Sequence, residues 1–108
     1  MVYPFGYTEP VYQLRQTETF GKWLATLRDA RAKARILARV ESVRLGNLGD
    51  IEPVGGSVIE MRVHVGAGYR VYCVRRGVII VLLCGGDKST QRKDIAQAKA
   101  LVHQLAQE

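Results

Sequence analysis

The chain has 108 residues, of which 47% are hydrophobic and 24% charged, and this composition is typical of one soluble globular domain covering residues 1–108. A formal net charge of +6 favours anionic partners such as nucleic acid, anionic lipid or an acidic protein, although a basic surface can also serve solubility alone. The longest apolar run, Val78 to Cys84, is far shorter than the roughly 20 residues that cross a bilayer. Because the start MVYPFGYTEP also lacks the parts of a signal peptide, we expect a cytoplasmic protein without a membrane segment.

The two cysteines, Cys73 and Cys84, have no second cysteine or histidine at metal-ligand spacing. His64 and His103 are the only imidazoles. We therefore expect buried thiols, no metal site and no cofactor, so that any chemistry is metal-free.

The first predicted elements are a short extended segment around Val11 to Arg15 and a helix capped by Thr17 or Thr19. Apolar residues follow at i, i+3, i+4 and i+7, which predicts a core stripe rather than a ligand-stacking platform. These residues are Phe20, Trp23, Leu24 and Leu27.

A second helix is predicted from Ala30 to Leu45, with Gly46 and Asn47 as its stop. Its expected apolar side consists of Ile36, Leu37, Val40 and Val43. Its opposite side carries a narrow basic stripe, Arg31, Arg35 and Arg39. Like charges at this spacing repel slightly, so the stripe is either a solvated face or a surface for phosphates or an acidic partner.

Residues Gly46 to Ser57, with four glycines and one proline, predict a loop. From Val58 the apolar period changes to two, which predicts a strand with one buried face. Gly66-Ala67-Gly68 fits a three-residue hairpin loop, after which the chain would return as a strand from Tyr69 to Arg75.

That loop length would pair Arg62 with Tyr72 and His64 with Arg70 on one open polar face, together with Glu60. The opposite, apolar face would pair Val63 with Val71 and Met61 with Cys73. A slip of one residue would disperse the polar cluster, because it would turn each side chain to the other face.

The run Val78 to Leu83 predicts a central strand covered on both faces, ended by Gly85-Gly86. Ser89 or Thr90 would cap a last helix. Its expected buried stripe consists of Ile95, Ala98, Leu101, Val102 and Leu105. The predicted fold is thus α+β, a small antiparallel sheet with two N-terminal helices and a C-terminal helix in the order β-α-α-β-β-β-α.

The polar face suggests an anion site, because guanidinium groups match phosphate geometry and Tyr72 can stack on a base. Arg62, Arg70 and Lys88, the last in a glycine-bearing loop that opens a helix, could hold the charge of a phosphorane during metal-free RNA cleavage. Candidates for the two proton transfers remain open: Glu60, His64, Tyr72 and Lys88. An exposed strand position in an ion pair is the alternative for each of them.

Two other kinds of site do not fit. GGDKSTQ lacks the Walker spacing of a phosphate loop, which argues against nucleoside triphosphate binding. No G-x-S-x-G elbow or supported Cys-His pair indicates covalent catalysis.

Most of the chain from Phe20 onward resembles the phage-derived addiction-module killer proteins, a HigB-like branch of the RelE/ParE toxin superfamily. The strings VIEMRVHVGAGYRVYCVRRG and IIVLLCGGDKSTQRKDIAQAKAL are similar to the family pattern E-L-R, G-Y-R-V-Y-Y and L-L-x-G-G-D-K-S-[ST]-Q-x-x-D-I. FGKWLATLRD and LGNLGDIEPVGG resemble its helical half. The chain departs by Met61 for the usual Leu and Cys73 for a second Tyr.

This resemblance implies a toxin of a type II toxin-antitoxin system that cuts mRNA on the ribosome by attack of the 2′-hydroxyl. It also implies an antitoxin, in this branch usually a helix-turn-helix protein from the adjacent gene, and a toxin-antitoxin hetero-oligomer. On these grounds the expected catalytic residues are Arg62, Arg70, Lys88 and Tyr72. The residues expected to bind RNA are Glu60, His64, Gln91, Arg92 and Lys93. Inhibition of DNA gyrase, as in the ParE branch, and a degenerate toxin that only binds its antitoxin remain the alternatives.

Overall fold

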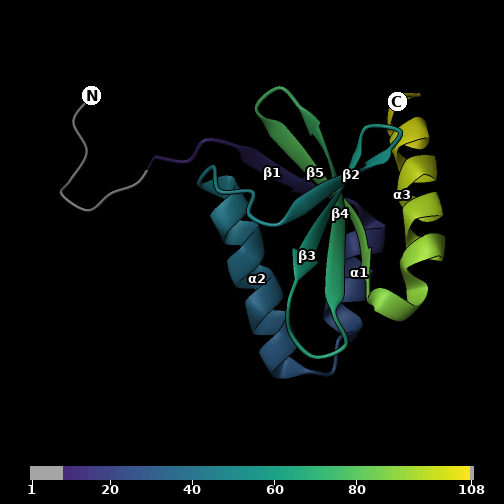
Figure 1. Cartoon of the computed structure of the whole chain (residues 1–108). Helices are drawn as coiled ribbons and strands as arrows, with labels where there is room; N and C mark the ends of the chain where they lie inside the picture. Colours follow the sequence, from purple (N-terminus) through teal and green to yellow (C-terminus); the bar gives the residue numbers. More distant parts are fainter. Residues whose placement is uncertain (1–8, 108) are drawn as a thin grey trace.

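The computed structural model describes residues 9–107, which form a five-stranded sheet with helices on both faces (Figure 1). The elements in chain order are β1 (Gln13–Gln16), α1 (Glu18–Thr26), α2 (Ala30–Arg44), β2 (Ile51–Gly55), β3 (Val58–Val63), β4 (Tyr69–Arg76), β5 (Ile79–Gly86), the 3₁₀ turn η1 (Lys88–Thr90) and α3 (Gln91–Leu105). The sheet order is β1-β5-β4-β3-β2, in which β1 runs parallel to β5 and the other pairs are antiparallel. The α+β class is confirmed, but the sheet is mixed rather than antiparallel, because β1 pairs parallel with β5. β2 is an additional strand, which pairs antiparallel with β3.

Part of the sequence expectations concerns the start of the chain. The expectation that the chain lacks a signal peptide depends on its first ten residues, and residues 1–8 lie outside the described part of the structure. Within residues 9–107 no helix is both long and apolar enough to cross a membrane.

Thr17 begins α1 and also ties it to the sheet. Its hydroxyl accepts a hydrogen bond from Phe20 N at 3.0 Å and donates one to Leu83 O at 2.5 Å. The first of these bonds satisfies a backbone N–H that has no partner inside the helix. Thr17, rather than Thr19, is therefore the cap, and Phe20 is fully buried as expected.

The second helix begins at Ala30, as predicted, because the Asp29 carboxylate accepts from two backbone N–H groups of the first turn at 3.1 Å each. The prediction that Leu37 lies in the core is wrong, since 48% of it is exposed. Neighbouring helix residues point about 100° apart. The buried stripe passes through Ile36 and Val43, which leaves Leu37 beside it.

The predicted loop from Gly46 to Ser57 is wrong in its second half, where Ile51–Gly55 forms β2 against β3. Pro53 and the glycines suggested a loop, but an edge strand tolerates a residue that cannot donate a ladder hydrogen bond. β2 lies at the edge of the sheet, where only one side of the strand pairs with a neighbour.

The predicted hairpin register is wrong by two residues along β4. Arg62 pairs with Arg70 rather than with Tyr72, and Glu60 pairs with Tyr72. His64 leaves the ladder, so residues 64–68 form the loop and His64 does not face Arg70. The apolar pairing changes in the same way, because Met61 faces Val71, Ile59 faces Cys73 and Val63 faces Tyr69. A shift by two preserves the alternation of faces, so the polar residues of β3 and β4 still share one face.

The polar face is not open, as the sequence suggested, because α3 packs over it. The buried hydrophobic residues on this side are Val58, Tyr72, Val74, Leu83, Cys84 and Ala98. The other face forms the larger core with α1 and α2, and it contains Phe20, Ile36, Val43, Met61, Val63, Val71, Cys73, Ile80 and Leu82. Both cysteines are free and buried, as expected.

The last strand is longer than predicted and the last helix begins differently. Gly85 and Gly86 belong to β5 rather than ending it, whereas Val78 precedes the strand and is exposed. The N-cap residue of α3 is Thr90, one of the two predicted alternatives, whereas Asp87 caps the preceding turn η1 by accepting from Ser89 N at 2.8 Å. Thr90 precedes α3 without a side-chain cap hydrogen bond.

Candidate functional site

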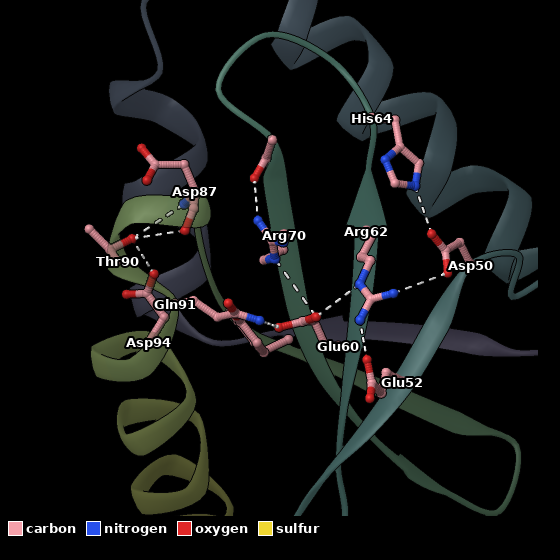
Figure 2. Close-up of polar contacts among 12 residues, drawn as sticks. Asp50, Glu52, Glu60, Arg62, His64, Arg70, Asp87, Thr90, Gln91 and Asp94 are labelled. Atoms are coloured by element: carbon pink, nitrogen blue, oxygen red, sulfur yellow. Dashed lines mark hydrogen bonds and ion pairs between the residues drawn. The ribbon is translucent and has the colours of Figure 1, made fainter.

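Glu60 is a fully buried carboxylate at the centre of the polar cluster, on β3 beside the start of α3 (Figure 2). Its Oε2 accepts hydrogen bonds from the Tyr72 hydroxyl at 3.1 Å and from Gln91 Nε2 at 2.8 Å. Its Oε1 lies 3.2 Å from Arg62 Nε and 3.7 Å from Arg70 Nε. One carboxylate thus connects β3, β4 and α3, and its charge is balanced by two guanidinium groups.

Arg70 is held at the hairpin end of β4 with only 13% of its side chain exposed. Its Nη1 donates to Gly68 O at 2.8 Å, while its buried Nε has no hydrogen-bond partner among residues 9–107. A Cβ placed on Gly68 would lie 3.6 Å from Arg70 Nη1 and 3.7 Å from Lys88 Cβ. The Arg70 guanidinium and the base of the Lys88 side chain therefore lie together beside Gly68, whereas the sequence analysis also expected Arg62 there.

Lys88 is exposed at the first position of η1, and no ion pair holds it within the described part of the chain. Gly68 has a φ of 77°, a conformation that glycine adopts without strain. The absence of a side chain on this loop residue leaves Arg70 and Lys88 space at one end of the sheet. A positive charge there is available to a ligand.

Arg62 is surrounded by carboxylates rather than being open to a phosphate. It pairs with Glu60, with Asp50 Oδ1 at 3.6 Å and closely with Glu52. The hydrogen bond to Glu60, together with the charges of Glu52 and Asp50, raises the pKa of Arg62. An anion can reach this guanidinium only by replacing one of its present partners.

Tyr72 and His64 differ in accessibility. Tyr72 is fully buried, and burial together with the charge of Glu60 raises its pKa, so its hydroxyl remains protonated and donates to Glu60. A base cannot stack on Tyr72 in this structure. His64 is exposed, and its Nε2 lies 2.6 Å from Asp50 Oδ2, a hydrogen bond that is the main cause of the lowered pKa of Asp50.

The first turn of α3 divides into an inner and an outer part. Gln91 points inward to Glu60, whereas Arg92 and Lys93 are exposed. Asp94 is buried and accepts from the Thr90 hydroxyl at 2.5 Å. Of the residues expected to bind RNA here, only Arg92 and Lys93 are exposed.

The basic stripe of α2 also divides. Arg31 and Arg35 are exposed, whereas Arg39 donates from Nε to Arg62 O at 3.2 Å and from Nη2 to Asp50 O at 3.0 Å. Burial lowers the pKa of Arg39. Arg39 thus connects α2 to the backbone of β3 and of the segment before β2.

The sequence analysis did not identify several acidic members of the cluster. Asp50 and Glu52 belong to the segment predicted as a loop, and only the pairing of β2 with β3 brings them to Arg62. Asp87 could have been found from its spacing to Thr90, since the two form a reciprocal capping box. Within the described residues no group of three or more His, Cys, Asp or Glu side chains could hold a metal ion.

The chain is similar to a known protein in sequence and to a solved structure in fold. No family model matches it. A Haemophilus influenzae protein described as uncharacterized is 51% identical over 94 residues, which cover 86% of this chain and 95% of that protein. One chain of the archaeal RelE-RelB complex from Pyrococcus horikoshii has a TM-score of 0.55 at 17% identity, covering 72% of this chain and 96% of that one. The chain therefore belongs to the same family as the Haemophilus influenzae protein and has a RelE-like fold.

Proposed function

We propose that the chain is the toxin of a type II toxin-antitoxin pair, of the HigB-like branch, and that it cuts mRNA on translating ribosomes. The observation that carries the proposal is the convergence of Arg70 and Lys88 beside Gly68 in a RelE-like fold. The structural neighbour was solved together with RelB, which supports a comparable antitoxin partner here. We expect that partner to be a helix-turn-helix protein from the adjacent gene, and the hetero-oligomer to be cytoplasmic.

The proposed cleavage is a metal-free attack of the RNA 2′-hydroxyl on the adjacent phosphate, with release of the 5′-oxygen. Arg70 and Lys88 hold the phosphorane charge, which is the largest contribution that such a site makes. Lys88, which is exposed, is the candidate to transfer a proton at this phosphate, whereas His64 lies beside Asp50, away from Arg70. Glu60 and Tyr72 are buried, so we propose that they position Arg70 rather than touch RNA.

The surrounding residues have supporting roles in this proposal. Arg92 and Lys93 are exposed in the first turn of α3, shortly after Lys88 in the sequence, and can contact flanking phosphates. Gln91 acts through its hydrogen bond to Glu60. Arg62 contributes to RNA binding when a phosphate replaces one of its carboxylate partners.

The test is induced expression of the wild type, Arg70→Ala and Lys88→Ala, with growth recorded and RNA 5′ ends mapped. The wild type should halt growth with mRNA cut at codon positions. Removal of one charge-stabilising group should lower cleavage by roughly 10²–10³ and restore growth. Arg76→Ala is the matched control, because Arg76 is an exposed arginine at the far end of β4, and it should stay toxic. Undiminished toxicity of Arg70→Ala and Lys88→Ala, with both proteins folded, would refute the site.

The carboxylates around Arg62 favour a second candidate, a degenerate toxin that only binds its antitoxin. Three of the four expected catalytic side chains, Arg62, Arg70 and Tyr72, are paired with a carboxylate or buried in the present arrangement. Normal growth on induction, combined with co-purification of the neighbouring gene product, would support this role. DNA breaks and filamentation without cut mRNA would instead indicate gyrase inhibition.

A further inference from the structure

A cationic groove of about 350 Å³ lies between α2, the segment before β2 and the end of β3, away from the convergence of Arg70 and Lys88. Its charged lining residues are Arg35, Arg39, Asp50, Arg62 and His64. Three guanidinium groups, an imidazole and one carboxylate thus line the groove, and one of these cations, Arg62, also pairs with Glu52 and Glu60 outside it. Ser42 and Asn47 add polar side chains, so the lining suits an oxyanion.

The carboxylate of Asp50 lies between Arg62 of β3 and His64 of the following loop. Its Oδ1 lies 3.6 Å from Arg62 Nη1, and its Oδ2 lies 2.6 Å from His64 Nε2 (Figure 2). The backbone of Asp50 is fixed separately, since its carbonyl accepts from Arg39 Nη2 at 3.0 Å and from Arg62 N at 3.1 Å. The side chain can therefore leave the groove without unfolding the segment that carries it.

Arg35 differs from the other cations in the groove. It is exposed, and no ion pair or hydrogen bond holds it within the described residues. Arg31, one turn earlier on the same stripe, is also exposed but does not line the groove. The groove thus has one guanidinium that is free to contact a ligand at once.

The groove is linked to the candidate site through Arg62. Its Nε is 3.2 Å from Glu60 Oε1, the same oxygen that lies 3.7 Å from Arg70 Nε. Neighbouring cationic positions along one surface are what a polynucleotide needs for successive phosphates. A strand held at Arg70 could therefore extend toward Arg62 and Arg35.

We propose that this groove is a second phosphate site for an RNA strand, and that the Asp50 carboxylate is an internal competitor that the phosphate displaces. The identity of the ligand as RNA rests on the proposed function. Displacement releases Arg62 Nη1 and His64 Nε2 to the phosphate, while Arg62 keeps its pairs with Glu52 and Glu60. Arg35 supplies the first contact, and Arg39 fixes the backbone of the segment that carries Asp50.

Binding of a fluorescently labelled single-stranded RNA oligonucleotide, measured by anisotropy over a salt series, tests the proposal. Lys88→Ala serves as the background, because the proposed function predicts that this variant can be expressed. Adding Arg35→Ala should weaken binding about fivefold and reduce the slope of log Kd against log salt by about 0.7, the value for one phosphate contact to a single strand. Arg31→Ala removes the same charge outside the groove and should change neither quantity appreciably.

Asp50→Asn should act in the opposite direction and tighten binding about fivefold, because the competitor loses its charge but keeps its size. Glu18→Gln is its control for net charge, since Glu18 is an exposed carboxylate on α1 that pairs with Lys22. Circular dichroism confirms that each variant is folded. Equal effects of Arg35→Ala and Arg31→Ala, or unchanged or weaker binding by Asp50→Asn, would overturn the proposal.

The measured quantity is binding and not cleavage, so the two proposals can fail separately. A non-toxic wild type whose RNA binding still responds to Arg35 and Asp50 would leave the groove in place and remove the proposed function. A toxic wild type without these responses would do the reverse.

Discussion

Glu60 is the residue whose replacement should cost the most stability in the polar cluster. Glu60→Ala removes a fully buried carboxylate and leaves the guanidinium of Arg70, 13% exposed, without its counter-charge. Breaking a buried pair from one side costs about 3–5 kcal/mol. Domains of this size have about 5–15 kcal/mol of stability in total, so the variant should be marginally folded.

Glu60→Gln separates the charge from the hydrogen bonds. The amide keeps the volume, and Tyr72 and Gln91 can each accept as well as donate, so both can turn to suit the new nitrogen. The lost charge then dominates, and the expected cost is about 1–3 kcal/mol. At about 4–8 °C per kcal/mol, Glu60→Gln should lower Tm by at least about 4 °C and Glu60→Ala by at least about 12 °C.

Urea unfolding followed by the fluorescence of Trp23, the only tryptophan, measures these changes. Trp23 packs against Phe20 and Tyr69, with ring centroids 5.8 and 6.4 Å apart, so its emission reports the core. Glu52→Ala is the control. It also removes a carboxylate that pairs with Arg62, but the Glu52 side chain is 56% exposed rather than buried. Its cost should stay below about 1 kcal/mol. If Glu60→Ala cost no more than Glu52→Ala, the central role of the buried carboxylate would be wrong.

Three further predictions concern packing, pH and thiol reactivity. Gly86→Ala should destabilise the chain by about 1–3 kcal/mol in the same urea assay, because the added Cβ would lie 1.8 Å from Asp94 Oδ2. An unchanged urea midpoint would contradict the close contact of β5 with α3. The hydrogen bond from His64 lowers the pKa of Asp50 in the folded chain, so its stabilising effect is complete above the ordinary value of 3.8 and is lost as pH falls through the lower folded pKa. The wild type should thus lose more stability than His64→Ala between roughly pH 4 and pH 2, and parallel pH profiles would exclude this coupling. Burial raises the pKa of both cysteine thiols to about 12, so a colorimetric thiol reagent at pH 8 should react only after urea unfolds the chain, and rapid reaction of the native protein would count against their burial.

Local patterns were sufficient where the interactions are local. The cap at Thr17, the start of α2 at Ala30 and the alternation from Val58 all depend on residues a few positions apart, and the structure contains each of them. The shared face of Glu60 and Arg70 survived a wrong register for the same reason, because alternation depends only on whether the shift is even.

The parts that were wrong depend on contacts between distant segments. β2 exists because β3 offers it a free edge, and it brings Asp50 and Glu52 to Arg62, which changes an open cation into a paired one. The burial of Glu60 depends on α3, whose first residue, Gln91, lies 31 positions away along the chain.

The convergence of Arg70 and Lys88 lies between these cases. The sequence by itself determined that both are basic residues at the ends of neighbouring predicted strands, together with the alternation, the caps and the resemblance to a toxin family. Only the tertiary structure decided that Gly68 stands between them, that Glu60 is buried beneath them and that Asp50 occupies the neighbouring groove. The physical reason is that the charge state and accessibility of a side chain are set by whatever packs around it, and the packing partners here come from β2 and α3.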